Sequence, residues 1–196
     1  MSEIDDAVSR ILRLKFEMGL FESPYVQPSR ATEIIRSKEH NRLARKVAEE
    51  SIVLLKNNAN LLPLSKNIGS IAVIGPNADN LYNQLGDYTA PQPEEHIVTI
   101  LEGIRNAVSP TTVIRYVKGC AVRDTTQSNI DEAVRAANAS NAVVLVVGGS
   151  SARDFRTKYI ETGAATVSSR ENELIPDMES GEGYDRKSLT LLGHQE

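Results

Sequence analysis

The side chains best suited to chemistry in this chain are the carboxylates of a long polar stretch, residues 150–187. A carboxyl group can act as a general acid when protonated, as a general base when ionised, or as a nucleophile. The stretch includes Glu161, Glu171, Glu173, Asp177, Glu179, Glu182 and Asp185. Most carboxylates at a protein surface are solvated charges with no further role, so residue type alone does not single one out.

Metal chemistry finds little support in the sequence. His40, His96 and His194 are far apart, and none has a second ligand at helical or turn spacing. Cys120 directly follows a predicted strand, so we interpret it as a small buried hydrophobic residue. As the only cysteine, it also excludes an internal disulfide framework. We therefore predict no metal site and no cofactor.

Two glycine-containing segments could be considered for phosphate binding. Residues 74–79 follow a predicted strand, but they lack the G-x-G-x-x-G spacing, and Pro76 removes a backbone donor. Residues 148–151 have no helical pattern behind them. Both segments are better explained as turns at strand ends, and a flavodoxin-like regulatory domain is correspondingly disfavoured.

A repeating strand-then-helix pattern precedes the long polar stretch. Apolar runs at residues 70–74, 112–117 and 142–147 predict strands, and residues 97–108 and 130–139 predict the helices between them. Strands that are continuously apolar are covered on both faces, so we predict an α/β fold: a three-layer sandwich with a mostly parallel sheet flanked by helices. The polar stretch leaves the third strand at its carboxyl end, where such sheets bind ligands.

The N-terminal part is predicted to be helical. Apolar residues recur at helical spacing over residues 4–16, Pro24 then introduces an extended linker, and a second helix follows at residues 40–51. That helix runs into an apolar, β-prone segment at residues 52–57. At the other end of the chain, residues 189–195 predict the beginning of another helix.

Charge and hydropathy exclude two classes of partner. The 22 basic and 26 acidic side chains are mixed along the 196 residues, so no basic patch for nucleic acid is formed. No apolar run approaches the roughly 20 residues of a membrane span. The N-terminus lacks the basic and apolar regions of a signal peptide, which leaves the cellular compartment unknown.

Several stretches, in order along almost the whole chain, resemble family 3 glycoside hydrolases, which are exo-acting β-glucosidases, β-xylosidases and their relatives. The matching stretches are residues 8–21, 40–64, 71–78, 85–88, Tyr116 with Gly119 and Cys120, residues 182–186, and residues 189–195. A small departure is Leu192, where the family usually has proline. The resemblance implies that residues 1–37 are the terminal helix of a barrel domain plus an interdomain linker. It implies that residues 38–196 are the first portion of a C-terminal (α/β)6 sandwich domain.

The resemblance also implies a retaining mechanism with two carboxylates. The family's nucleophile is an aspartate of the barrel domain, and no segment of this chain matches it. By motif, the acid/base falls on Glu182, with Glu179 as the runner-up because the local sequence allows a small alignment slip. Arg153 and Asp154 are candidates for substrate contacts. Asp185 and Arg186 are expected to be a charged pair that holds the loop against the domain.

The expected partners are a β-glycoside or oligosaccharide substrate and the barrel domain of the same protein. Without that barrel, we expect the chain alone to be inactive and to self-associate through an unpaired sheet edge. Many members of the family are exported to the periplasm or the medium. The sequence does not decide between glucose, xylose or another sugar, and a non-catalytic carbohydrate- or ligand-binding α/β module remains the alternative function.

Overall fold

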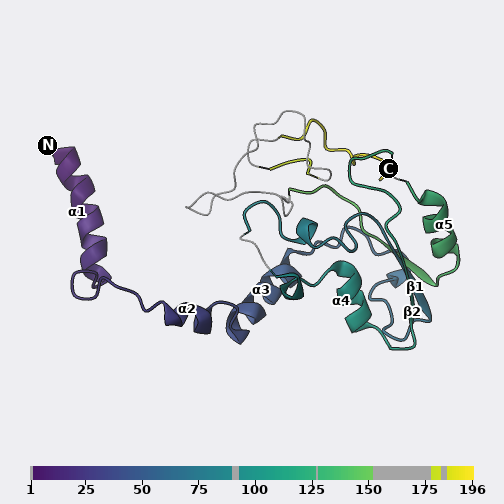
Figure 1. Cartoon of the computed structure of the whole chain (residues 1–196), viewed down its shortest axis with the longest axis horizontal. Helices are drawn as coiled ribbons and strands as arrows, with labels where there is room; N and C mark the ends of the chain where they lie inside the picture. Colours follow the sequence, from purple (N-terminus) through teal and green to yellow (C-terminus); the bar gives the residue numbers. More distant parts are fainter. Residues whose placement is uncertain (1, 90–92, 127, 152–177, 182–184) are drawn as a thin grey trace. The chain divides into compact units, whose positions relative to one another are not determined.

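The computed structural model describes residues 2–89, 93–126, 128–151, 178–181 and 185–196. The chain divides into two compact units, residues 1–61 and 62–196, and each is described by itself (Figure 1). The sequence places its domain boundary earlier, between residues 37 and 38. That boundary concerns the intact protein and stays a prediction.

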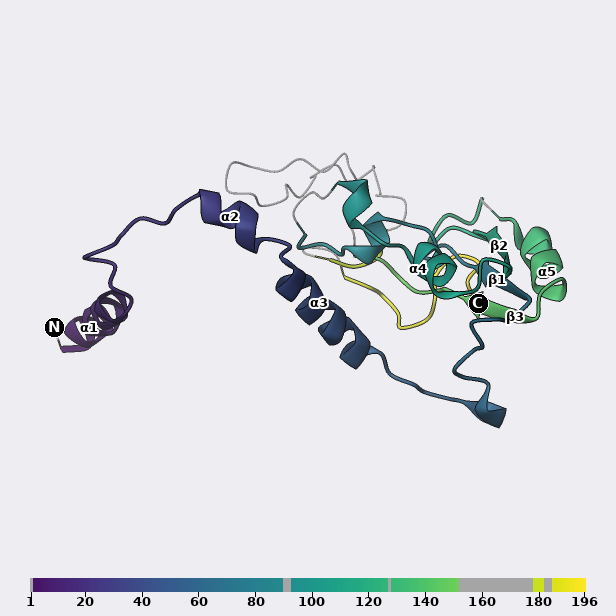
Figure 2. The same cartoon turned by 90° about the horizontal axis from the view of Figure 1, so that it is seen from below.

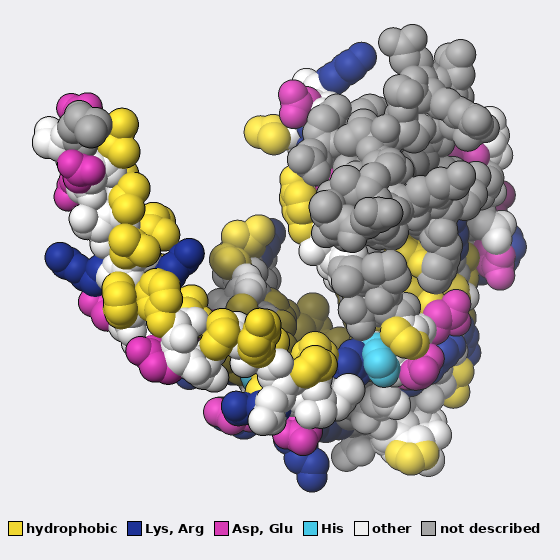
Figure 3. All heavy atoms as spheres, turned by 60° about the vertical axis from the view of Figure 1, so that its left-hand side comes forward, with side chains coloured by type: hydrophobic (Ala, Val, Ile, Leu, Met, Phe, Trp, Pro, Cys, Tyr) yellow, Lys and Arg dark blue, Asp and Glu magenta, His cyan; other side chains and the backbone are white. Residues whose placement is uncertain are grey.

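The first unit contains three helices, α1 (Ser2–Glu17), α2 (Ser29–Ile34) and α3 (Lys38–Ser51). Helices α1 and α3 agree with the predicted helices. Ser37 caps α3 by accepting a hydrogen bond from the backbone N–H of His40 at 3.3 Å. None of the three helices has a buried residue. Figure 3 shows the hydrophobic side chains of this part of the chain lying open along one side.

Two expectations for this unit are corrected. The predicted extended linker contains α2, which begins directly after Pro28, whose φ of −59° already suits a helix. The apolar segment at residues 52–57 has no regular secondary structure, and Ile52 and Val53 are 78% and 73% exposed. A β-prone segment forms a strand only where another strand satisfies its backbone hydrogen bonds.

The second unit is built on a parallel sheet of three strands, β1 (Ser70–Ile74), β2 (Val113–Val117) and β3 (Ala142–Leu145). The spatial order is β2-β1-β3, so β1 is central, and Ile71 pairs with Ile114 on one side and Ala142 on the other. The central strand is apolar on both faces, and Ala72 and Val73 have no exposed surface. This confirms the predicted parallel sheet.

Two helices cover the opposite faces of the sheet, as Figure 2 shows. Helix α4 (Ile100–Ala107) buries Leu101 against a cluster that includes Ile71 and Val73. Helix α5 (Ile130–Asn138) buries two alanines, Ala133 and Ala136, in a cluster with Ala72, Ile74 and Val117. Alternate residues of β1 thus face different helices, and the predicted three-layer α/β arrangement is confirmed.

The C-terminal segment does not form the helix that the sequence predicts. Residues 189–195 are irregular, with a turn at Gly193 and His194. Gly193 has a φ of +64°, and an added Cβ would lie 3.0 Å from the carbonyl oxygen of Val122. The Gln195 side chain accepts a hydrogen bond from the N–H of Gly148 at 2.8 Å and donates one to the carbonyl of Val122 at 3.2 Å. These tertiary contacts override the local helical pattern.

Candidate active site

The loops that follow β1 and β3 are joined by a network of side-chain amides. Asn77, after β1, donates to the carbonyl oxygen of Gly148, after β3, at 3.2 Å. Asn83 donates to Asn77 at 2.6 Å and accepts from the Ser150 hydroxyl at 2.7 Å. The carboxyl edge of the sheet is therefore a connected polar framework, which suits a ligand site because polar groups there are already oriented.

Close backbone approach at this edge requires glycine. Gly75 has a φ of +129°, and a Cβ there would lie 2.0 Å from the carbonyl oxygen of Val146. Gly148, with a φ of +140°, also lies in a region that favours glycine. Gly75 directly follows β1 and Gly148 lies shortly after β3, which fits their interpretation as turns at strand ends.

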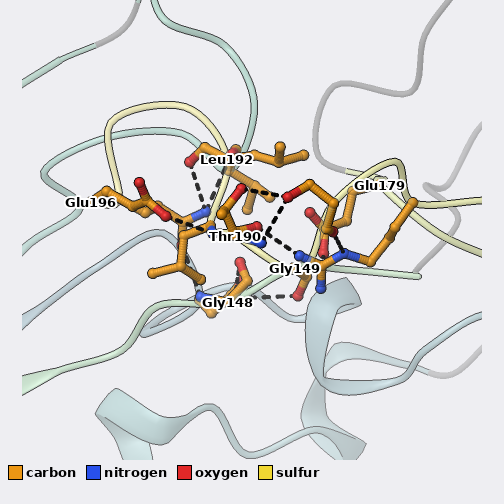
Figure 4. Close-up of polar contacts among 12 residues, drawn as sticks. Gly148, Gly149, Glu179, Thr190, Leu192 and Glu196 are labelled. Carbon is orange, nitrogen blue, oxygen red and sulfur yellow. Dashed lines mark hydrogen bonds and ion pairs between the residues drawn. The ribbon is translucent and has the colours of Figure 1, made fainter.

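Glu179 packs against the loop that follows β3. Its side chain is only 3% exposed, and its N–H donates to the carbonyl of Ser150 at 2.9 Å. A Cβ added to Gly149 would lie 1.4 Å from Glu179 Oε1, so glycine is the only residue that leaves room for this carboxylate. Figure 4 shows Glu179 beside Gly149, with the dashed contacts around them.

The partner of the Glu179 carboxylate is Arg186, whose Nη1 lies 2.9 Å from Glu179 Oε1. The other two guanidinium nitrogens also donate hydrogen bonds, Nε to the carbonyl of Ser188 at 3.1 Å and Nη2 to that of Thr190 at 2.8 Å. All three nitrogens of Arg186 are therefore used. The planar guanidinium fixes the path of residues 186–190 as well as the position of Glu179.

Two further residues hold the segment that contains Glu179. Arg123, in the loop after β2, donates to the carbonyl of Met178 at 2.6 Å. Asp87, in the loop after β1, lies beside Gly181, where an added Cβ would be 2.9 Å from Asp87 Oδ2. Asp87 is buried, at 9% exposure. Residues 178–181 are thus held from two different loops.

A cleft of about 430 Å³ opens at this position. Its walls carry both charges, and the lining residues are Arg123, Glu179, Asp185, Arg186, Lys187, Ser188 and Leu192. A concave site with converging charged groups at the carboxyl edge of a parallel sheet is a candidate for ligand binding. No sequence pattern marks Arg123, Gly149 or Asp87, since each acquires its role from a residue distant in the chain.

The predicted site residues fall into two groups. Glu182, Arg153 and Asp154 lie outside the described residues. Glu179, Asp185 and Arg186 lie together around the cleft. The sequence pairs Arg186 with Asp185, whereas the ion pair that the structure shows joins Arg186 to Glu179. A direct contact between Asp185 and Arg186 stays a prediction.

The histidine and cysteine near this edge have structural surroundings. Cys120 is 8% exposed, and burial raises the pKa of its thiol, which disfavours the reactive thiolate. His194 Nε2 lies 3.0 Å from the carbonyl oxygen of Thr125. Among the residues that the structure describes, no three His, Cys, Asp or Glu side chains gather where they could hold a metal ion. No described helix is both long and apolar enough to cross a membrane.

The fold and the cleft define an α/β domain with a candidate ligand site at the carboxyl edge of its sheet. Residues 52–196 match the glycosyl hydrolase family 3 C-terminal domain. Because this match covers most of the chain, the chain belongs to glycoside hydrolase family 3, and the resemblance seen in the sequence is confirmed.

Individual relatives agree with this assignment. The chain is 37% identical over 201 aligned positions to a periplasmic β-glucosidase of Salmonella typhimurium, covering 90% of this chain and 25% of that protein. It is 41% identical to a β-xylosidase of Formosa agariphila, and the alignment covers 76% of this chain and 21% of that protein.

Solved structures show the same similarity. A β-glucosidase involved in saponin metabolism from intestinal bacteria matches with a TM-score of 0.63 at 36% identity, over 76% of this chain and 24% of that one. A β-glucosidase from Listeria innocua in complex with glucose matches with a TM-score of 0.56 at 31% identity, over 72% of this chain and 19% of that one. The chain thus spans a quarter or less of the length of these relatives.

Proposed function

We propose that this chain forms part of a retaining exo-β-glycosidase and supplies its acid/base, Glu182. The substrate is a β-glycoside or oligosaccharide with a terminal glucose or xylose. The observation that carries the proposal is the family match through residue 196, which includes the Glu182 motif at residues 182–186. The names of the relatives, β-glucosidase and β-xylosidase, support this class of substrate.

The proposed reaction has two steps. A nucleophilic aspartate of the barrel domain attacks the anomeric carbon, while Glu182 gives its proton to the departing glycosidic oxygen. Glu182, now ionised, then takes a proton from the water that releases the sugar from the aspartate. The two carboxyl groups of a retaining site stand about 5–5.5 Å apart, so the barrel must lie against this loop. The isolated chain should therefore have no hydrolase activity.

Glu179, the runner-up, is less suited to this role. A general acid must carry a proton and reach the substrate oxygen. The Glu179 carboxylate is almost fully buried and is bound to the Arg186 guanidinium at 2.9 Å. The carboxylate is therefore already engaged within the domain and has little surface through which it could reach a substrate oxygen. These observations favour Glu182 over Glu179.

The other site residues keep smaller roles in the proposal. Arg153 and Asp154 contact the sugar, and Asp185 lines the cleft beside Arg186. The periplasmic name of the Salmonella relative supports export of the full-length protein.

The test compares Glu182→Gln with the wild type in the full-length protein. One substrate is an aryl β-glycoside with a good leaving group, and the other is a disaccharide whose leaving group needs a proton. We expect kcat/KM for the disaccharide to fall by about 100-fold or more in this variant. The variant should still be glycosylated by the aryl substrate, and azide should restore its turnover.

The matched control is Glu173→Gln, a change of the same kind at a nearby carboxylate without an assigned role. It should behave as the wild type on both substrates. If Glu182→Gln also behaves as the wild type, the acid/base assignment is wrong, and the non-catalytic binding module becomes the better explanation.

A further inference from the structure

We infer that the Glu179–Arg186 ion pair is a clasp that positions the acid/base loop, so that both side chains are positioning residues for glycoside hydrolysis. The inference rests on the proposed function of Glu182. The pair joins Arg186 Nη1 to Glu179 Oε1 at 2.9 Å, and these two residues flank residues 180–185 in the sequence. Glu182 belongs to that segment by its place in the sequence.

The incoming end of the loop is held by the loops that follow β2 and β3, and the outgoing end by hydrogen bonds within the segment that follows it. On the incoming side, Glu179 donates its N–H to Ser150, and Arg123 donates to the carbonyl of Met178 at 2.6 Å. On the outgoing side, Arg186 donates to the carbonyls of Ser188 and Thr190. The clasp therefore connects two anchored ends, and its loss would leave the chain between them less constrained.

The surroundings of the pair point to positioning more than to stability: the Glu179 side chain is 3% exposed and that of Arg186 is 32% exposed. Removing the carboxylate from water costs free energy that its attraction to the guanidinium often only balances. Such an ion pair is consequently weak support for stability, but its fixed geometry restricts where the chain can go. The forked guanidinium of Arg186, with a partner at each nitrogen, provides such a restriction.

A positioning role differs measurably from a purely structural one. In the first step, which determines kcat/KM, a misplaced acid slows only substrates whose leaving group needs a proton, whereas a smaller folded fraction lowers the rate for every substrate equally. Displacing a catalytic group by about 1 Å can cost about 100-fold in rate. A variant without the clasp should therefore lose kcat/KM for the disaccharide selectively and retain kcat/KM for the activated aryl glycoside.

The experiment uses the full-length protein with Glu179→Gln and Arg186→Met combined. The double substitution removes both charges together, so no charge is left buried without its partner. We expect kcat/KM for the disaccharide to fall about 100-fold, while kcat/KM for a dinitrophenyl β-glycoside stays within about threefold of the wild type. Azide should not rescue the variant, because the Glu182 carboxylate is still present.

Arg186→Lys is the second variant, and it decides the matter if the double variant does not fold. Lysine keeps the charge but offers one nitrogen where arginine offers three. We expect kcat/KM of this variant to fall about tenfold for the disaccharide only, while its circular dichroism spectrum stays that of the wild type. Wild-type activity on both substrates, or equal losses on both, overturns the clasp.

Glu182→Gln, measured in parallel, separates failure of the clasp from failure of the proposed function. If Glu182→Gln shows the selective, azide-rescued loss and the clasp variants do not, the clasp is overturned and the function stands. If Glu182→Gln is unaffected and the double variant, which lacks the Glu179 carboxylate, shows that loss with azide rescue, Glu179 is the acid/base and both proposals fail. If all variants match the wild type, both proposals also fail.

Discussion

The two units of the chain carry equally regular apolar patterns and use them differently. In residues 1–61, Ile4, Val8 and Ile11 follow helical spacing along α1, yet they are 64%, 49% and 60% exposed. In residues 62–196, Leu101 and Val73 have no exposed surface. A helical pattern thus needs only its own hydrogen bonds to form a helix, whereas burial needs a partner surface. The family match begins at residue 52, and the sheet unit contains the core that the chain builds for itself.

The largest expected effect lies in that core. Leu101→Ala should lower the free energy of unfolding of the sheet unit by about 2–5 kcal/mol, because it leaves a cavity between α4 and β1. The matched control is Val47→Ala in α3, where the side chain is 57% exposed. This change should alter the free energy of unfolding of the sheet unit by less than about 0.5 kcal/mol. Urea unfolding of the 196-residue chain measures both. Equal losses would show that the two units do not differ in packing.

The next effect concerns the loop edge of the sheet. Gly149→Ala should destabilise the sheet unit by about 2–4 kcal/mol, because the new methyl group would occupy the position of the Glu179 carboxylate. Gly103→Ala, in the middle of α4, should instead stabilise it by about 0.5–1 kcal/mol. The nearest atom to a Cβ at Gly103 is 3.9 Å away. Thermal unfolding should move in opposite directions for the two variants.

Helix capping tests the same contrast at a smaller scale. Thr99 caps α4, accepting from the N–H of Glu102 at 3.2 Å and donating to Asp79 at 2.7 Å, and it is buried. Thr99→Ala should cost about 1–2 kcal/mol of global stability. Ser37→Ala removes the cap of α3, which has no buried residue, and should leave the urea midpoint of the sheet unit unchanged. A shifted midpoint for Ser37→Ala would mean that α3 unfolds together with the sheet.

The smallest effect on folding is expected at the free edge of the sheet. Val143 and Leu145 of β3 are 47% and 61% exposed, on the face that α5 covers over β1. Leu145→Lys should change stability by less than about 0.5 kcal/mol, while reducing self-association of the isolated chain. Sedimentation velocity at several concentrations measures this. A wild-type chain that stays monomeric would refute the expectation of self-association.

Much of the fold could be predicted from local sequence. The run at residues 70–74 is apolar from Ile71 to Ile74 and bounded by Gly69 and Gly75, and β1 has the same limits. Helix α5 differs from its prediction by one residue, since its apolar spacing and its flanking polar residues agree. The prediction of a helix at residues 189–195 was wrong because the Gln195 contacts and the backbone at Gly193 decide that segment. The family motif singles out Glu182 as the proposed acid/base, whereas residue type alone could not.

The sequence by itself determined the α/β class, the parallel sheet, the family and the motif that carries the proposed acid/base. These features depend on periodicity and on residues that are neighbours in the chain. Only the tertiary structure decided that Glu179 is buried against Gly149, that Arg186 pairs with it, and that Asp87 and Arg123 hold the same segment. These contacts join loops that are far apart in sequence, and the meaning of a charged residue depends on whether water or another charge surrounds it.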